Sequence, residues 1–414
     1  MSDSTHPSHP PLSPSVIHMG SIDALHAYDD PVELILLGTG TSSTLPHVDC
    51  LTAPPGAKPC RTCLSTLTPE GWKNKRRNTS AVLRVRGRDG LPKTIVIDVG
   101  KSFMPAAVEW FPKYGLRHID AVLITHAHAD AMNGLDDLRG WTLGGAIQQA
   151  VDIYLSAETF EAVKIAFPYL VRKEFASGGG DVPEFNWHPY VTDREPFEIG
   201  DTGITVKPYA VPHGFCGAKP VKPVPSIADQ IAAAVPFSTS SPCGTGMPGT
   251  PTTTGNVTPV EKEKKEDFLC LGFTVQNAVT YISDCSKIPD DVLADLLSSP
   301  IPVLVLDCLR LKAHLSHLSL AQAVEYARQL RAQRTYLLGF SHEVSHEEYE
   351  VMLRAVGGHR VPKNRMTEMV TAGLDTLDLG GEKIWIRPAF DGLQVFVSDK
   401  GEARDTAYYD YPEE

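Results

Sequence analysis

A histidine-rich loop follows a short buried strand in the first third of the chain. Residues 125–131 read Thr-His-Ala-His-Ala-Asp-Ala, directly after the largely apolar run 119–124. Two histidines and an aspartate, each two residues apart on a loop leaving a strand, can converge on one point. Imidazole and carboxylate are the ligands that zinc, manganese and iron accept at open catalytic sites. The loop therefore predicts that His126, His128 and Asp130 bind a metal.

The composition is that of an acidic chain with enough apolar residues for a large core. Of the 414 residues, 42% are hydrophobic, and the formal net charge is −12. Such a chain does not offer a broad surface to extended nucleic acid, so we expect a small-molecule partner. The longest apolar runs, such as 301–306, are too short to span a bilayer, and the N-terminus lacks an apolar signal core. We therefore expect no membrane partner and a cytoplasmic location, with the nucleus left open.

Strands and helices alternate along most of the chain. Residues 1–31 predict a disordered N-terminal tail, and residues 401–414 predict a C-terminal tail. A stretch rich in Pro, Thr, Ser and Gly at 217–266 predicts a surface insert within a single domain over 32–400. Strands dominate both halves of this domain, with helices between them. The pattern predicts an α/β fold in which two sheets pack face to face with helices outside, an αββα four-layer sandwich.

Four more polar side chains come where apolar strands end. They are Asp98, His213, Asp284 and His342. Polar groups at the ends of buried strands face the same sheet edge, so they can meet in one pocket although they are distant in sequence. The metal-binding loop therefore has candidate partners from four other strands.

This series resembles the metallo-β-lactamase superfamily, an αββα sandwich of metal-dependent hydrolases. Within the superfamily, several features are similar to the phosphoribosyl 1,2-cyclic phosphate phosphodiesterase family: residues 37–42, Cys50, Cys60, Cys63, 74–80 and 389–393. The tRNA 3′-processing endonucleases are more distant relatives with the same ligand types. The resemblance implies a fold of the metallo-β-lactamase type.

The resemblance also implies roles for the site residues. A first metal would be bound by His126, His128 and His213. Asp284 would bridge to a second metal, and Asp130 would bind that metal or hold the attacking water. Asp98 would accept a hydrogen bond from a ligand imidazole and fix its tautomer. Zinc is the expected cofactor, with manganese as the alternative at the catalytic site.

Two positions depart from the pattern of that family. Its histidine loop usually ends in Asp-His, where this chain has Asp130 and Ala131. Its late strand usually ends in His-x-x-His, and the first of those positions is Gly339 here. Both missing histidines would serve the second metal. Either one catalytic metal suffices, or other residues replace the missing ligands, with His317 and His346 as candidates.

Three of the eight cysteines cluster early in the chain. Cys60 and Cys63 form a Cys-x-x-Cys pair, and Cys50 lies upstream. Structural zinc sites take four ligands. In the resembling phosphodiesterases the fourth ligand is the second histidine of the late His-x-x-His, which matches His342. The resemblance therefore implies a structural zinc; the alternative is three free thiols on a Pro-rich loop.

Two histidines precede a helical pattern over 318–333. In the resembling phosphodiesterases and endonucleases, a histidine at this place contacts phosphate and protonates the leaving oxygen. His317 fits best by spacing and His314 second, and histidine titrates in the range that a general acid needs. The alternative is a capping loop in which Ser316 or Ser319 caps the helix and the histidines are merely exposed.

Asp136 and Arg139 follow the metal-binding loop on a predicted helix. We expect them either on the helix surface or behind the metal ligands. Arg139 is also a candidate contact for a phosphate.

These residues together predict a metal-dependent hydrolase of a small phosphodiester, with cyclic phosphates among the candidates. The metal would lower the pKa of a bound water, and the resulting hydroxide would attack phosphorus while His317 protonates the leaving alkoxide. One alternative is an acyl hydrolase of the same superfamily, acting on a lactone or thioester, because the same ligands serve both reactions. Another is a degenerate member that binds metal and a partner without turnover. Ala131 and Gly339 favour that second alternative, whereas the intact first-site ligands oppose it.

Overall fold

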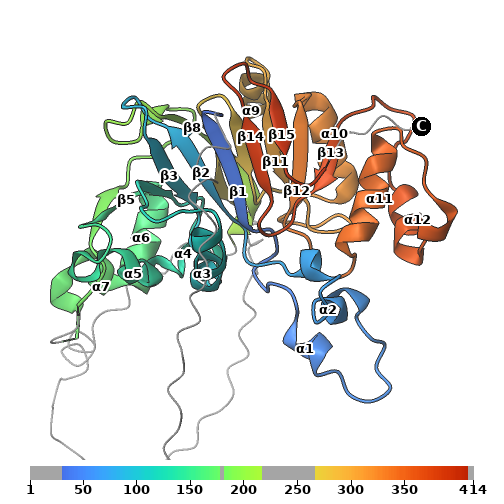
Figure 1. Ribbon diagram of the computed structural model, residues 1–414, viewed down its shortest axis with the longest axis horizontal. Helices are drawn as coiled ribbons and strands as arrows, with labels where there is room; N and C mark the ends of the chain where they lie inside the picture. The colour runs from blue at the N-terminus through green and yellow to red at the C-terminus, as the bar shows by residue number, and fades with distance from the viewer. Residues whose placement is uncertain (1–29, 178–180, 217–265, 409–414) are drawn as a thin grey trace, which may run out of the picture.

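Two mixed β-sheets packed face to face form the centre of the computed structural model (Figure 1). The structure describes residues 30–177, 181–216 and 266–408. The tail expected at 1–31 and the insert expected at 217–266 therefore lie almost entirely outside the described residues.

The sheets have eight and seven strands, in the orders β15-β14-β1-β2-β3-β4-β5-β6 and β13-β12-β11-β10-β9-β8-β7. The first sheet consists of β1 (Val32–Gly38), β2 (Ser80–Arg86), β3 (Pro92–Ile97), β4 (Ala121–Leu123), β5 (Val151–Tyr154), β6 (Phe185–His188), β14 (Gln394–Val397) and β15 (Ala403–Asp405). The second consists of β7 (Phe197–Glu198), β8 (Thr205–Cys216), β9 (Glu266–Val275), β10 (Val279–Ile282), β11 (Val303–Asp307), β12 (Arg334–Leu338) and β13 (Ile386–Pro388). Strands β3 to β6 run parallel, and so do β10 to β13, so their carboxyl ends gather at one edge of each sheet.

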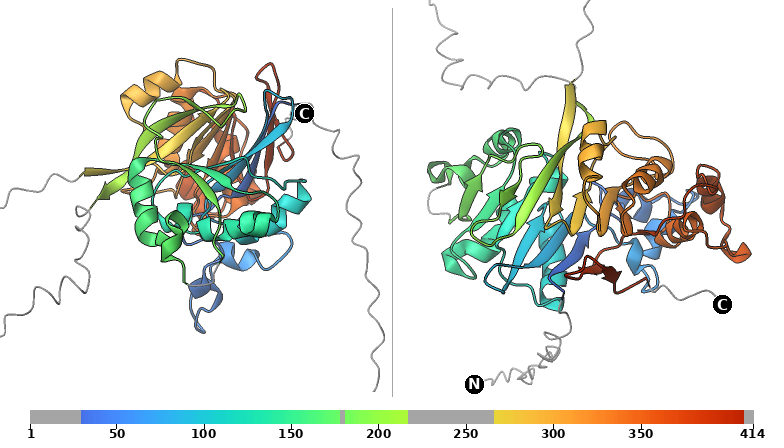
Figure 2. Two further views of the ribbon diagram at one scale, coloured as in Figure 1. Left: turned by 90° about the vertical axis from the view of Figure 1, so that its left-hand side faces the viewer. Right: turned by 90° about the horizontal axis from the view of Figure 1, so that it is seen from above.

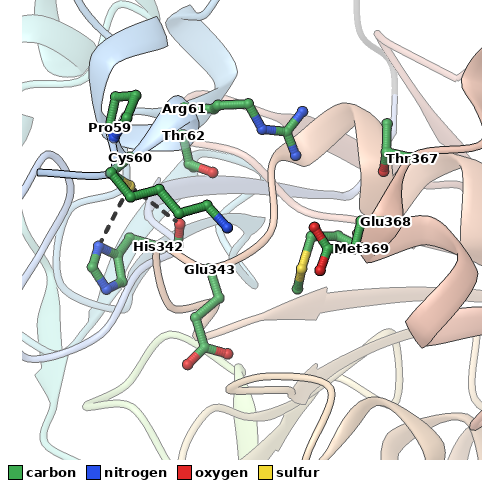
Figure 3. A pocket seen from close by; sticks show the side chains of 10 residues that line it. Pro59, Cys60, Arg61, Thr62, His342, Glu343, Thr367, Glu368 and Met369 are labelled. Atoms are coloured by element: carbon green, nitrogen blue, oxygen red, sulfur yellow. Dashed lines mark hydrogen bonds between the residues drawn. The ribbon is translucent and has the colours of Figure 1, made fainter. Parts of the chain in front are cut away.

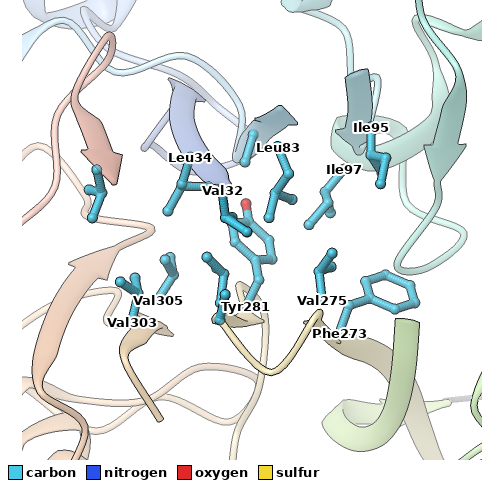
Figure 4. Packing of buried hydrophobic residues seen from close by; sticks show 14 of the residues in the cluster. Val32, Leu34, Leu83, Ile95, Ile97, Phe273, Val275, Tyr281, Val303 and Val305 are labelled. Atoms are coloured by element: carbon cyan, nitrogen blue, oxygen red, sulfur yellow. The ribbon is translucent and has the colours of Figure 1, made fainter. Parts of the chain in front are cut away.

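The alternation of side chains along the strands explains the layers. In β1, Leu34 and Leu36 belong to the cluster between the sheets, whereas Ile35 and Leu37 belong to the cluster on the outer face. Figure 4 shows part of the inner cluster, in which Tyr281 of the second sheet reaches towards side chains of the first. Because both faces of each sheet are covered, the strands read as nearly continuous apolar runs in the sequence.

Helices cover the outer faces of both sheets (Figure 1). Helices α3, α5, α6 and α7 pack on the first sheet, and α9, α10, α11 and α12 pack on the second. The helices are α1 (Val48–Leu51), α2 (Arg61–Ser65), α3 (Phe103–Lys113), α4 (Ala129–Met132), α5 (Arg139–Thr142), α6 (Ala157–Ala166), α7 (Pro168–Val171), α9 (Asp290–Leu296), α10 (Leu320–Leu330), α11 (His346–Val356) and α12 (Glu368–Leu374). This arrangement confirms the expected αββα sandwich. Among the described residues, no helix has both the length and the apolar character needed to cross a membrane.

Strands β8 and β9 continue beyond the second sheet as a two-stranded ribbon (Figure 2). The register shifts between Pro212 and Phe215, so that His213 and Gly214 on β8 lie opposite the single residue Phe268 on β9. Such a bulge bends a strand and redirects its side chains. Gly214 has φ +81°, in the left-handed region that glycine adopts without strain. The bulge therefore sets the direction of the His213 side chain.

Two expected boundaries are corrected by the strand pairing. Glu266 pairs with Cys216 as the first residue of β9, so it belongs to the sheet rather than to the insert. Residues Ala403–Asp405 form β15 instead of a free C-terminal tail. The buried Tyr336 hydroxyl donates a hydrogen bond to the carboxylate at the end of that strand (2.7 Å). This long-range contact attaches the strand to the second sheet, and the local composition does not indicate it.

Leu34 tests the inner cluster because it is fully buried between the sheets. Leu34→Ala should lower the free energy of unfolding by about 2–5 kcal/mol, from lost transfer free energy and the cavity left behind. Denaturant unfolding followed by tryptophan fluorescence measures the change. Leu91, which is 60% exposed, provides the control. Leu91→Ala should change the free energy of unfolding by less than about 0.5 kcal/mol. Equal effects of the two substitutions would contradict the packing described.

Candidate metal centre

Three histidines meet at the sheet edge where β4 ends and β8 bends. His126 and His128 lie on the loop after β4, and His213 lies in the β8 bulge. One ligand nitrogen from each of the three lies within 4.8 Å of the others. Their ring centroids are 4.7 Å (His126–His128) and 5.1 Å (both pairs with His213) apart. The three residues that the resemblance implied for a first metal are thus brought together.

Hydrogen bonds fix which nitrogen of His213 and His126 faces the centre. His213 Nδ1 lies 2.7 Å from the Ser316 carbonyl oxygen; a carbonyl only accepts, so Nδ1 carries the proton and Nε2 keeps its lone pair. The Thr125 hydroxyl donates to Asp98 (2.7 Å) and lies 2.8 Å from His126 Nδ1. Its only hydrogen goes to Asp98, so it accepts from His126 Nδ1 and leaves Nε2 of His126 unprotonated.

The expectation for Asp98 needs a correction. Its carboxylate bonds the Thr125 backbone N–H (2.8 Å) and hydroxyl, and reaches His126 only through that hydroxyl. Asp98 follows β3 with φ +60°, which turns its side chain towards the next strand. The sequence pattern gave no sign of Thr125 as the intermediary. A carboxylate that orients a ligand imidazole through one further group still fixes the imidazole tautomer.

The electrostatics of the three histidines suit a cation. Burial lowers the pKa of His126 to about 3 and lowers the pKa of His128, so both imidazoles are neutral. Nε2 of His126 is buried without a hydrogen-bond partner in the described part of the chain. An unsatisfied buried acceptor is costly, and a divalent cation bound by the three imidazoles would satisfy it. The residues present therefore fit a catalytic metal at this point.

Two carboxylates lie beside the histidines. Asp284, directly after β10, is buried and forms a second group with His213 and His317, again with ligand atoms within 4.8 Å. Burial alone would raise the pKa of Asp284, but His126, His213 and His317 bring it below its usual value. Burial and the Asp284 charge raise the pKa of Asp130. Asp130 joins neither group of candidate ligands.

His317 is held by a carboxylate that the sequence analysis missed. Its Nδ1 lies 3.0 Å from Asp307, the last residue of β11, which also accepts from the Leu318 backbone N–H (2.7 Å). Burial raises the pKa of Asp307 to about 6. Burial would lower the pKa of His317, but the Asp307 charge raises it to about 9. Asp307 carries the same signal as Asp98 and Asp284, an acid at the end of an apolar strand, which would have identified it.

The cysteine cluster closes around one histidine. Sγ of Cys50, Cys60 and Cys63 lie 3.2, 3.7 and 3.7 Å from Nδ1 of His342. Zinc–sulfur bonds of about 2.3 Å and zinc–nitrogen bonds of about 2.0 Å at tetrahedral angles place sulfur and nitrogen about 3.5 Å apart. Burial, with the neighbouring thiols, raises the pKa of Cys50 to about 12, so without a cation this thiol stays protonated. The four residues fit the expected Cys₃His zinc site.

The loop that carries His342 is held from behind by Arg76. This buried guanidinium donates to the backbone carbonyls of Ser341 (2.5 Å) and Val344 (3.0 Å). Cys60 and His342 also line a surface pocket of about 500 Å³, with Cys60 directed towards the imidazole (Figure 3). Arg76 therefore holds the backbone behind His342, and the pocket gives a cation access to Cys60 and His342 from the surface.

Known proteins share this fold. The family model described as the beta-lactamase superfamily domain matches residues 93–220 and 223–340, more than half of the chain. The chain belongs to the β-lactamase superfamily. It is accordingly a hydrolase of the metallo-β-lactamase fold, and this membership implies a divalent metal.

Two solved structures share the fold. A diphosphatase of the PhnP family is 23% identical, with a TM-score of 0.54, covering 88% of this chain and 96% of that one. Zinc-bound PqqB from Methylobacterium extorquens is 14% identical, with a TM-score of 0.52, covering 87% and 99%. An octanoyltransferase from Porphyromonas gingivalis is 31% identical over 182 residues, which span 44% of this chain and 30% of that protein.

Four other candidate site residues do not belong to the groups of metal ligands among the described residues. His346 begins α11 and is buried, with Nε2 3.0 Å from the Tyr408 hydroxyl, so it cannot replace a metal ligand. Asp136 and Arg139 pair with each other (2.6 Å) and are partly exposed, as expected for helix-surface residues rather than residues behind the ligands. His314 is exposed and accepts from the Ser316 hydroxyl (3.1 Å), with its ring 5.5 Å from that of His317.

Cys60→Ala should reduce the bound zinc by about one ion per chain and lower the melting temperature, because a structural zinc contributes folding free energy. Metal content by mass spectrometry and thermal unfolding measure the two effects. Cys285→Ala is the control, since this buried thiol belongs to no candidate ligand group among the described residues. Unchanged zinc content in both Cys60→Ala and Cys63→Ala would refute the assignment.

Thr125→Val tests the connection between Asp98 and His126. The substitution keeps the shape but removes the hydroxyl, so metal affinity at the three-histidine site should fall by about 10- to 100-fold. Titration of the metal-free protein with manganese measures the affinity, and Thr125→Ser, which keeps the hydroxyl, should stay near wild type. If Thr125→Val binds metal as tightly as Thr125→Ser, the hydroxyl has no part in orienting His126.

Proposed function

We propose that this superfamily member hydrolyses a small phosphodiester. The observation that carries the proposal is the three-histidine group beside the His317–Asp307 pair, which puts a cation site and a proton donor on one sheet edge. Hydrolysis of an acyl substrate needs the cation site, whereas an alkoxide that leaves from phosphorus gains most from the proton donor. The fold shared with a protein named as a diphosphatase supports the same substrate class.

The residues divide the reaction between them. His126, His128 and His213 would hold a divalent cation, which would supply an activated water and charge stabilisation at the phosphoryl oxygens. Asp284, buried beside that group, accepts a hydrogen bond from the attacking water and takes its proton. His317, whose Nδ1 is held by Asp307, gives the proton on Nε2 to the leaving alkoxide. One proton is taken and one is given, and the products are a phosphomonoester and an alcohol.

The substrate is proposed to be small rather than a long nucleic acid. The net charge of −12 opposes the long-range attraction that polyanions need. Arg139, the candidate phosphate contact after the histidine loop, is already paired with Asp136. Recognition of a single phosphodiester by the metal and a few side chains does not require such a surface.

An acyl substrate is the second candidate, and two observations favour it. The similarity to a protein named as an octanoyltransferase covers 44% of this chain. Phe268 on the β8–β9 ribbon stacks on His128 (centroids 4.5 Å apart, planes at 14°), and Phe215 and Leu269 of the same ribbon are each 53% exposed. Such a surface suits an acyl chain as well as an aromatic alcohol.

The test compares both substrate classes on one preparation. Chelated protein, reloaded with zinc or manganese, is assayed on bis(para-nitrophenyl) phosphate and on a para-nitrophenyl acyl ester. We expect metal-restored turnover of the phosphodiester, loss of at least about 1,000-fold in His126→Ala because a ligand of the activating cation is gone, and wild-type rates for the exposed control His118→Ala. Turnover of the ester alone would replace the phosphodiester with an acyl substrate, and no turnover of either by the metal-loaded protein would indicate a binding protein.

A further inference from the structure

We infer that the catalytic centre holds a single divalent cation, because the residues around Asp284 do not supply the ligands that a second one would need. The inference does not depend on the substrate. It follows from the space at Gly339, from the number of free ligand atoms beside Asp284, and from the position of Asp130.

A side chain at position 339 would crowd the carboxylate of Asp307. This residue follows β12 with φ +83°, a conformation that residues with a side chain rarely adopt. A Cβ at this position would lie 3.0 Å from Oδ1 of Asp307. That oxygen is the one bonded to His317 Nδ1. A ligand side chain at position 339 would therefore collide with the Asp307–His317 pair.

The group around Asp284 does not make an independent second site. It consists of Asp284, His213 and His317. His213 has only Nε2 to offer, because Nδ1 is bonded to a carbonyl, and Nε2 belongs to the three-histidine site. The nitrogen of His317 that lies 3.9 Å from Asp284 is Nδ1, the same atom that Asp307 holds at 3.0 Å. A cation bound through Nδ1 of His317 would have to break that hydrogen bond.

The remaining carboxylates do not supply the missing ligands. Among the described residues, neither Asp130 nor Asp307 belongs to a group of three ligand atoms within mutual reach. Ala131, where the resemblance would place a histidine, is buried and offers no ligand atom. Zinc sites in enzymes take at least three protein ligands. The carboxylates of Asp284 and Asp130 remain, and two ligands are too few for a second cation in the described part of the chain.

The experiment counts metal ions on the full chain and needs no turnover. Wild-type protein reloaded with excess manganese and zinc should retain about two ions per chain, one catalytic and one in the cysteine site. His126→Ala and Cys60→Ala should each lose about one, and His317→Ala should lose none. His314→Ala, a change of the exposed neighbouring histidine, is the matched control. Three ions in the wild type, or the loss of one in His317→Ala but not in His314→Ala, would overturn the inference.

A spectroscopic measurement covers the case in which a variant does not fold. The electron paramagnetic resonance spectrum of manganese-loaded wild-type protein should be that of isolated ions. The multiline signal of an exchange-coupled manganese pair would overturn the inference. If the single-ion result holds while phosphodiester turnover is absent, the proposed function fails and the single-cation centre stands.

Discussion

Burial of both sheets on both faces is the constraint on which the rest of this structure depends. The parallel strands are covered by the opposite sheet and by a helical layer, so apolar side chains predominate along them and the carboxylates of the site lie where strands end. Asp98, Asp284 and Asp307 all occupy such positions, on β3, β10 and β11. Parallel direction then brings these ends to one edge, and the site is assembled by the requirement to bury apolar surface.

The same burial makes the metal part of the fold. The buried Nε2 of His126 has no partner among the described residues and burial keeps its imidazole neutral, so this acceptor is costly without a cation. The cysteine cluster has the same character, with a thiol whose pKa is raised to about 12. A divalent ion bound at the three-histidine site or at the cysteine cluster would give these groups ligand bonds. Folding and metal uptake would then be coupled at both sites.

The cysteine site also joins distant parts of the chain. Cys60 and His342 are 282 residues apart, and Arg76 bonds the backbone around His342. A cation there would attach the N-terminal loop to the segment between β12 and α11. That segment also contains Gly339, whose conformation leaves room for Asp307. The structural cluster and the single-cation centre are therefore placed by one connection.

Much of this protein could be predicted from its sequence, because alternating burial and strand-end polar residues leave a local pattern. The apolar runs predicted the sandwich, and the His-x-His-x-Asp loop and the Cys-x-x-Cys pair marked the two clusters. The resemblance to known phosphodiesterases then implied His213 and His342 as their further members. Only the tertiary structure decided which side chains are hydrogen-bonded to one another. The Thr125 hydroxyl lies between Asp98 and His126, Asp307 holds His317, and His346 faces Tyr408. It also decided the bulge at His213 and the edge strand β15. Periodicity shows which face of a strand is buried, but register and hydrogen-bond partners depend on how separate strands are placed relative to one another, and that placement is a property of the packed whole.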